Sequence, residues 1–236
     1  MDSSEGPITY RAEGDVAVVS FDDGKVNALT HVALGQLEEA LDRAEAEAAA
    51  LLVVGRDGKF SAGFDLSVMT AGPTQARELL ERGARLGLRL FEYPLPVVLG
   101  VTGHALAMGG ILLCCADVRI AAAGPYKIGL NEVRIGMPVP RFAVELCRSR
   151  LTPPAFTQAM HLATIHDPDS ALTAGFVDEV VPMADVADRS LEVAAELAGA
   201  LHRTPFRITR ANCNGRTAEL LRASLAEDLA EFNVEG

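Results

Sequence analysis

The sequence predicts an α/β protein in which buried strands alternate with amphipathic helices. Residues 51–54 and 96–101 are apolar runs, residues 117–122 repeat the pattern, and a helix-like stretch precedes each of them. Wholly apolar runs are typical of parallel strands that helices cover on both faces. The alternation therefore favours a mostly parallel sheet, with functional residues in the loops that follow the carboxyl ends of its strands.

The first third of the chain supplies a hairpin and two long helices. Residues 8–11 and 16–21 are predicted strands, and the turn-forming segment Glu13-Gly14-Asp15 joins them. A helix is expected from residue 30 to residue 48, because apolar residues recur there at helical spacing and Thr30 is placed to cap the N-terminus. A second long helix is expected at about residues 74–91.

The pattern changes to helices after Pro138. Residues 177–182 are the one late strand candidate, and we expect residues 1–182 to form the core and residues 183–236 a C-terminal helical region for oligomerisation. The leucines of that region exceed what two terminal helices bury between themselves, so a partner subunit is expected to cover them. The predicted helices span residues 139–148, 153–162, 183–202 and about 217–232, and the leucines are Leu191, Leu197, Leu201, Leu220, Leu221, Leu225 and Leu229.

Composition and charge exclude several classes of protein. The chain has 236 residues, with 21 Lys and Arg against 32 Asp and Glu, for a net charge of −11. Such a charge repels a nucleic-acid backbone. No apolar run is long enough to cross a bilayer, and the first residues lack the basic and apolar parts of a signal peptide. We therefore expect a cytoplasmic protein that binds neither nucleic acid nor membrane.

The cysteines and histidines do not indicate a metal site. Cys114, Cys115, Cys147 and Cys213 lack Cys-x-x-Cys spacing, and the first two lie in an apolar run, which favours reduced, buried thiols. His161 and His166 are five residues apart, off the spacing that puts two side chains on one helix face. We interpret both as surface residues, and no metal is expected.

Two glycine-rich turns carry the first functional signal. Phe60-Ser-Ala-Gly-Phe-Asp-Leu66 and Gly103-His-Ala-Leu-Ala-Met-Gly-Gly-Ile-Leu-Leu113 each turn from an apolar strand-like run into a helix-like run. Backbone N–H groups are free where a helix starts, so two such breaks that face each other can bind a developing oxyanion. The alternative is that Gly63, Gly109 and Gly110 only allow close packing of helix on strand.

Other familiar chemistries lack their motifs. There is no phosphate-binding loop of the Gly-x-x-x-x-Gly-Lys-Ser/Thr type, no dinucleotide fingerprint and no Gly-x-Ser-x-Gly nucleophile elbow. His104, which lies between a buried strand and the second glycine turn, is by itself better explained as a hydrogen-bonded packing residue than as a base.

Taken in order, these segments resemble the crotonase superfamily, the family of enoyl-CoA hydratases and isomerases. The resemblance covers nearly the whole chain, and no one segment is decisive without the others. It is carried by Lys25-Val-Asn-Ala-Leu29, Phe60-Ser-Ala-Gly-Phe-Asp-Leu66, Gly103-His-Ala-Leu, Cys115-Ala-Asp117, Ile128-Gly-Leu-Asn-Glu-Val-Arg-Ile-Gly136 and Ala174-Gly-Phe-Val-Asp-Glu-Val-Val-Pro182.

The resemblance implies a spiral of β-β-α units with a C-terminal helical trimerisation region, and therefore a homotrimer or a dimer of trimers. It also implies an acyl-CoA thioester as substrate, with coenzyme A as part of the substrate and no separate cofactor. By position, the N–H groups of Phe64 and Met108 form the oxyanion hole, with Gly109 as an alternative donor because Met replaces the usual Gly at 108. The residues placed near the CoA or the acyl group are Lys25, Val26, Ala28, Ala62, Gly63, Asp65, Leu66 and Ile111.

The number of glutamates in the active site distinguishes two reactions of the family that this sequence resembles. Hydratases of the family use two glutamates, of which one corresponds to Glu132 and the other to Ile111, which cannot transfer a proton. One carboxylate still suffices for a 1,3-proton shift, so the resemblance favours a Δ3,Δ2-enoyl-CoA isomerase. Burial against Ile111 is expected to raise the pKa of Glu132 toward neutrality.

Three alternatives stay open at this point. Glu132 could instead form an ion pair with Arg134 or cap a loop. The chain could hydrate 2-enoyl-CoA with Glu145 or His104 recruited in place of the missing glutamate. It could also bind acyl-CoA without turnover, as a sequestering or regulatory protein.

Overall fold

The computed structural model describes residues 6–231 and centres on a six-stranded sheet. The strand order is β1-β2-β4-β7-β9-β11, in which β1 and β2 form the predicted antiparallel hairpin and every other neighbouring pair is parallel. The strands are β1 (Ile8–Glu13), β2 (Val16–Phe21), β4 (Ala50–Gly55), β7 (Val97–Val101), β9 (Val118–Ala122) and β11 (Glu179–Val181). The parallel sheet predicted from the apolar runs is confirmed.

A second strand follows most strands of the large sheet and lies in a smaller one. One small sheet has the order β10-β8-β5 and the other pairs β3 with β6, all parallel. Two strands and then helix recur along the chain, which confirms the spiral of β-β-α units. These strands are β3 (Ala28–Leu29), β5 (Gly58–Ser61), β6 (Gly63–Phe64), β8 (Gly103–Leu106) and β10 (Ile128–Gly129).

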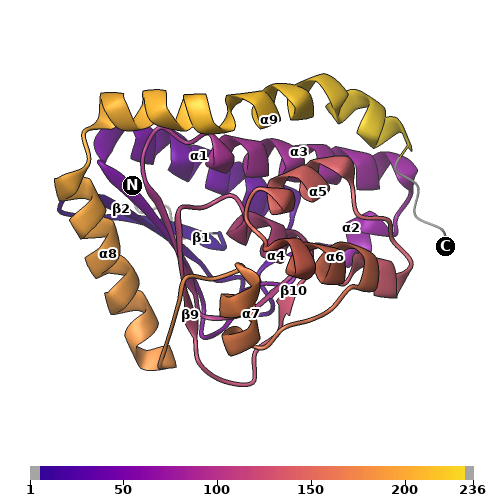
Figure 1. Cartoon of the computed structure of the whole chain (residues 1–236), viewed down its shortest axis with the longest axis horizontal. Helices are drawn as coiled ribbons and strands as arrows, with labels where there is room; N and C mark the ends of the chain where they lie inside the picture. Colours follow the sequence, from indigo (N-terminus) through magenta and orange to yellow (C-terminus); the bar gives the residue numbers. More distant parts are fainter. Residues whose placement is uncertain (1–5, 232–236) are drawn as a thin grey trace.

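Helices cover both faces of the large sheet (Figure 1). The sequence of strand β4 is wholly apolar because both faces of the strand are buried. Leu51 and Val53 face the large core beneath α1 and α3, whereas Leu52 and Val54 face a second core beneath α8. Strands buried on both faces carry no polar alternation. The longer helices are α1 (His31–Glu47), α3 (Pro73–Phe91), α8 (Val186–Ala200) and α9 (Arg203–Glu231).

Short helices surround the smaller sheets. They are α2 (Leu66–Met69), α4 (Met108–Leu113), α5 (Arg141–Arg148), α6 (Pro153–Leu162) and α7 (Pro168–Ala174), with the 3₁₀ turns η1 (Glu132–Ile135) and η2 (Met183–Asp185). The cap predicted for α1 is confirmed, since the Ala33 N–H donates to the Thr30 hydroxyl oxygen at 3.0 Å. Helix α7 was not predicted from the sequence.

The C-terminal part corrects one predicted boundary. The last helix was expected from about residue 217, but α9 begins at Arg203 and packs along α3 and α5 (Figure 1). The buried Arg210 donates to the carbonyl oxygens of Tyr93 and Leu95 and pairs with Asp117. A charged residue at a buried position broke the apolar pattern that would have revealed the first half of this helix. Residues 1–5 and 232–236, which include the predicted last residue Phe232, lie outside the described residues.

Two further side-chain predictions can be compared with the structure. The interpretation of His166 as a surface residue is wrong: it is buried, its backbone bridges to Ile128, and its ring lies against Phe176 at a centroid distance of 5.7 Å. His161 is exposed, and Cys114 and Cys115 are buried free thiols, as predicted. Cys147 is also a buried free thiol. Within residues 6–231, no helix is long and apolar enough to cross a bilayer.

Candidate active site

The two glycine turns predicted from the sequence lie against each other. Gly63 has φ +90°, and a Cβ atom built there would lie 2.9 Å from the Cβ of Ala107 and 3.1 Å from the backbone nitrogen of Met108. Neither that backbone conformation nor that space admits a side chain. Glycine at 63 is therefore what allows the β6 strand to contact the start of helix α4.

The orientation of two backbone N–H groups follows from the strands and helices around them. The Asp65 N–H donates to the Leu29 carbonyl at 3.3 Å. Successive N–H groups of an extended segment point to opposite sides, so the Phe64 N–H points away from β3. Met108 is the first residue of α4, where N–H groups have no intrahelical acceptor. Both donors thus lie at the meeting of the two turns.

Gly109 and Gly110 have the packing role that the sequence left open. A Cβ atom on Gly109 would lie 2.4 Å from the Ser61 carbonyl oxygen, and one on Gly110 would lie 2.8 Å from the Gly129 carbonyl oxygen. Helix α4 therefore sits directly on the strands beside it. The residue before α4, Ala107, has φ 51° and ψ −126°, a conformation that L-residues rarely adopt. Strain of this kind clusters at functional sites.

The register of the small sheet brings Glu132 to these turns. Ala105 pairs with Ile128 and Leu106 with Gly129, and the Ala107 N–H donates to the Gly129 carbonyl at 3.1 Å. Glu132 follows three residues later as the first residue of η1. The motif around Glu132 and the second glycine turn are thus neighbours because β10 and β8 pair.

Glu132 is a buried acid with one free oxygen. Its residue is 8% exposed, and its Oε2 atom has no hydrogen-bond partner among the described residues, so the predicted alternative of an ion pair with Arg134 is not formed there. Burial raises the pKa of Glu132 to about 7, although the backbone N–H groups of Glu132 and Asn131 donate to the carboxylate and act in the opposite direction.

Glu132 opens into a small, mostly apolar cavity of about 90 Å³. Glu132 is the sole ionisable side chain among the described residues that line it. Sequence reasoning missed Phe142, since an apolar residue on a helix looks the same whether it lines a cavity or fills the core. The lining residues are Ala62, Phe64, Leu66, Met69, Leu80, Ala107, Ile111, Asn131, Glu132, Ile135, Met137, Pro138, Pro140 and Phe142.

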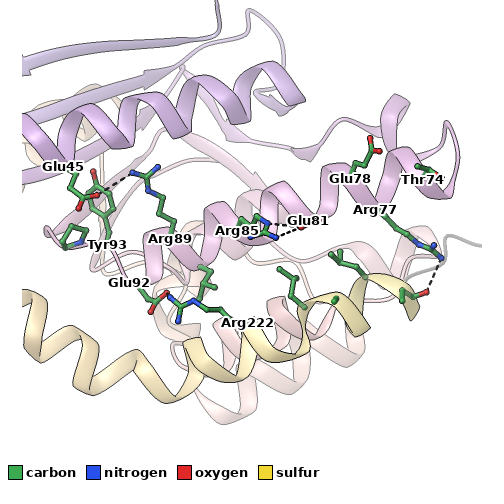
Figure 2. Close-up of a pocket in the computed structure, with 16 residues that line it drawn as sticks. Glu45, Thr74, Arg77, Glu78, Glu81, Arg85, Arg89, Glu92, Tyr93 and Arg222 are labelled. Carbon is green, nitrogen blue, oxygen red and sulfur yellow. Dashed lines mark hydrogen bonds and ion pairs between the residues drawn. The ribbon is translucent and has the colours of Figure 1, made fainter.

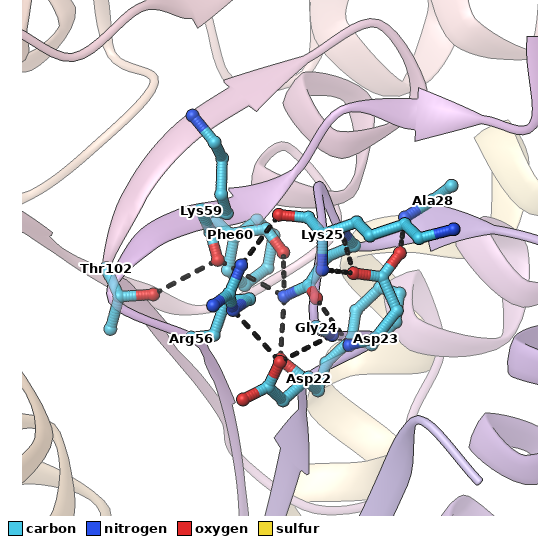
Figure 3. A network of polar contacts seen from close by, with 11 residues as sticks. Asp22, Asp23, Gly24, Lys25, Ala28, Arg56, Lys59, Phe60 and Thr102 are labelled. Carbon is cyan, nitrogen blue, oxygen red and sulfur yellow. Dashed lines mark hydrogen bonds and ion pairs between the residues drawn. The ribbon is translucent and has the colours of Figure 1, made fainter.

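A rigid loop lies at the edge of this site. The Asp23 carboxylate accepts hydrogen bonds from the backbone N–H groups of Lys25, Asn27 and Ala28, which lower the pKa of Asp23 although burial opposes the effect (Figure 3). Arg56 pairs with Asp22 at 2.9 Å and donates to the Lys25 carbonyl oxygen. The side chains of Lys25 and Val26 remain exposed.

The predicted site residues fall into two groups. Ala62, Phe64, Leu66, Ile111 and Glu132 line the cavity, and Gly63, Met108 and Gly109 lie in the turns that border it. Lys25, Val26 and Ala28 belong to the rigid loop, which joins the site where the Ala62 N–H donates to the Val26 carbonyl at 3.0 Å. Asp65 caps α2 through the Ser67 N–H. Neither His104, which accepts from the Lys127 N–H, nor Glu145 lines the cavity.

A larger hollow lies elsewhere, between α3 and α9. It measures about 920 Å³ and is lined by arginines and glutamates (Figure 2). Arg85 pairs with Glu81 at 2.6 Å, Arg222 pairs with Glu92, and the Arg77 side chain donates to the Ala230 carbonyl oxygen. These three arginines of the groove are thus engaged with a glutamate or with the backbone.

Comparison with known proteins identifies the family. The profile described as Enoyl-CoA hydratase/isomerase matches residues 11–232. Enoyl-CoA delta isomerase 1 of Homo sapiens, a mitochondrial protein, is 30% identical over 226 residues, which are 94% of this chain and 74% of the human one.

Solved structures agree with this assignment. An enoyl-CoA hydratase/isomerase family protein from Pseudomonas syringae has a TM-score of 0.93 at 35% identity, covering 96% of this chain and 98% of its own. An enoyl-CoA hydratase from Mycobacterium marinum has a TM-score of 0.91 at 41% identity, covering 97% and 100%. The chain belongs to the enoyl-CoA hydratase/isomerase family of the crotonase superfamily. It is an enzyme of fatty acid metabolism.

Proposed function

We propose that this protein isomerises 3-enoyl-CoA to 2-enoyl-CoA, with Glu132 as the proton carrier. The observation that supports the proposal is that Glu132 is the sole ionisable side chain among the described residues lining the cavity. Ile111, in the same cavity, occupies the position of the second hydratase glutamate. A site with one acid can move a proton but lacks the second group that holds and activates water.

The proton shift needs a base and a stabilised oxyanion. Ionised Glu132 removes a proton from C2, and the electron pair moves onto the thioester oxygen to give a dienolate. The Phe64 and Met108 N–H groups donate to that oxygen, aided by the positive end of α4, and Gly109 remains a second candidate donor. Protonated Glu132 then returns its proton at C4, which leaves the double bond between C2 and C3. A pKa of about 7 suits both transfers near neutral pH.

The rigid loop that contains Lys25 supports a proposed binding site for the coenzyme A portion of the substrate. Arg56 is engaged with Asp22 and the Lys25 carbonyl, whereas the Lys25 side chain is exposed beside the turn that holds Ala62. We propose Lys25 as the first phosphate-binding residue, with Val26, Ala28, Asp65 and Leu66 along the same route. The reaction needs no further cofactor, because coenzyme A arrives as part of the substrate.

We also propose an oligomeric state and a cellular location for this protein. Leu201, Ile208 and Leu220 of the C-terminal helices and their junction are 40 to 54% exposed, which supports burial in a homotrimer or a dimer of trimers. We propose that the assembly works in the cytoplasm.

The decisive experiment compares 3-enoyl-CoA and 2-enoyl-CoA with the purified protein. We expect 2-enoyl-CoA from the first substrate, and we expect Glu132→Gln to abolish that activity. Glu145→Gln is the matched control, because Glu145 pairs with Arg148 on α5 away from the cavity and should leave the rate unchanged.

The other outcomes are equally clear. Isomerisation that persists in Glu132→Gln would overturn the role of Glu132. Formation of 3-hydroxyacyl-CoA from 2-enoyl-CoA would instead make the protein a hydratase. Binding of acyl-CoA with turnover of neither substrate would make it a silent binding protein.

A further inference from the structure

The N-terminus of α5 is capped by a residue from the other end of the fold. Pro140 stands at the cap position and supplies no side-chain hydrogen bond. Asp228 of α9 takes that role: one carboxylate oxygen accepts from the Arg141 N–H at 3.0 Å and the other accepts from the Phe142 N–H at 3.1 Å. Asp228 itself is 7% exposed. A buried carboxylate on two N–H groups is a strong, directional cap.

The capped end of α5 forms one wall of the cavity that holds Glu132. Pro140 and Phe142 line this cavity, and Phe142 is one of the two residues whose N–H groups Asp228 holds. A cavity of about 90 Å³ is small. Because a cavity of roughly 150 Å³ accepts benzene, this one has room for about three or four carbon atoms. The place of Phe142 therefore sets how much acyl chain fits.

The hydrogen bonds of the first half of α9 lie away from the cavity. Arg210 binds the backbone around Tyr93 and Leu95, and Asn214 donates to the Phe91 carbonyl at 2.7 Å. These contacts hold the first half of α9 on the end of α3. Figure 1 shows α9 continuing along α3 to α5, where Asp228 makes the link to the cavity wall.

We propose that Asp228 is a positioning residue for substrate selection, which fixes α5 so that Phe142 limits the acyl cavity to short chains. The inference rests on the proposed function, since it assigns the cavity to the acyl group. It makes the C-terminal helix part of the substrate site as well as of the oligomerisation region. Glu132 and the oxyanion donors are not touched by Asp228, so the effect falls on fit rather than on proton transfer.

The test uses Asp228→Asn and Asp228→Ala in the full chain. Asparagine keeps the shape and one acceptor oxygen, and alanine removes both. Glu227→Gln is the matched control, because Glu227 is the adjacent residue on α9 and only forms an exposed pair with Arg141 at 3.6 Å. The probes are 3-enoyl-CoA substrates of short and medium chain for turnover, and butanoyl-CoA and octanoyl-CoA, which cannot isomerise, for binding.

Loss of a helix cap changes an equilibrium by roughly ten-fold. We expect the preference for the shorter chain, measured as the ratio of kcat/KM values and of the two dissociation constants, to fall about ten-fold in Asp228→Ala and less in Asp228→Asn. The kcat value for the short substrate should stay within about two-fold, because Glu132 remains in place. Hydrogen exchange of the Arg141 and Phe142 amides should accelerate in both variants.

Each result decides between the proposals. A lower melting temperature with an unchanged chain-length ratio would overturn the inference, because Asp228 would then be only structural. Wild-type protein that binds both acyl-CoA probes but turns over neither enoyl-CoA would end the proposed function, while the binding ratio would still test Asp228. Failure of the wild type to bind either probe would overturn both.

Discussion

Two hollows of this molecule, the groove between α3 and α9 and the cavity around Glu132, differ in size and in how their charges are partnered. The groove between α3 and α9 measures about 920 Å³ and the cavity around Glu132 about 90 Å³. In the groove, ion pairs such as Arg85 with Glu81 neutralise the charges in contact with water (Figure 2). In the cavity, one acid is buried with an oxygen that no described residue satisfies.

This difference explains why chemistry is expected in the smaller hollow. In an exposed ion pair, which gains little energy, each charge is already satisfied by its partner and by water. Burial without a charged partner raises the pKa of an acid toward neutrality, where the acid can both accept and donate a proton. The unpaired group, more than the volume, identifies the candidate active site.

Among substitutions at positions other than Glu132, Gly63→Ala should cause the largest loss of activity, because it distorts the cavity around Glu132 and leaves the groove intact. The new methyl group would clash with Ala107 and the Met108 nitrogen and displace a donor of the proposed oxyanion hole. Loss of one such donor costs about 10² to 10³ in kcat. Steady-state isomerisation measures this effect.

Gly14→Ala controls for backbone strain alone. Gly14 also has positive φ, at +57°, but nothing lies within 4 Å of the added Cβ atom. Its stability should fall by about 1 kcal/mol while kcat stays unchanged. Equal losses of kcat in the two variants would show that the contact between the glycine turns is not special.

The sequence predicted these turns because their information is local. Each glycine turn is a short segment with strand residues before it and helix residues after it, and the motif around Glu132 is just as compact. Family resemblance then gave the segments their order in space. The same reasoning gave the sheet, since strands such as β4 are apolar on both faces.

What the sequence did not show depends on contacts between distant residues. Asp228 and Phe142 are 86 positions apart, so nothing local marks an aspartate on α9 as the cap of α5. His166 was interpreted as a surface residue from its spacing to His161, yet its backbone pairs with Ile128 and its side chain is buried. Contacts with residues distant in the sequence determine both the role of Asp228 and the burial of His166.

The second prediction concerns the cost of keeping Glu132 buried. Its pKa in the folded protein, about 7, lies above its usual value of 4.5, so the folded state holds the proton more tightly than the unfolded state. Stability therefore falls as pH rises from 4.5 through about 7, by about 3 kcal/mol. We expect Glu132→Gln, which stays neutral, to be more stable than wild type at about pH 8 and similar at about pH 4.5. Urea denaturation at both pH values measures the difference in stability. A Glu132→Gln variant that is less stable than wild type at the higher pH would contradict the prediction.

The third prediction is the pH profile of catalysis. In the proposed reaction Glu132 is ionised when it accepts the C2 proton, so kcat/KM should lose about ten-fold for each pH unit below a midpoint near 7. The profile of Glu145→Gln should coincide with that of wild type. A midpoint near 4.5 would mean that Glu132 is solvated in the free enzyme, and the contrast between cavity and groove would lose its electrostatic basis.

The smallest effect is expected in the groove. Arg85 and Glu81 form a pair one helical turn apart, and the Arg85 side chain is 65% exposed. Arg85→Ala should therefore cost about 0.3 to 0.5 kcal/mol of stability, less at high salt, and leave kcat/KM unchanged. Thermal unfolding at two salt concentrations and the isomerase assay measure the two quantities. A loss of activity without a loss of stability would show that the groove takes part in the reaction, because a solvated ion pair on the outside of α3 has no other route to the reacting atoms.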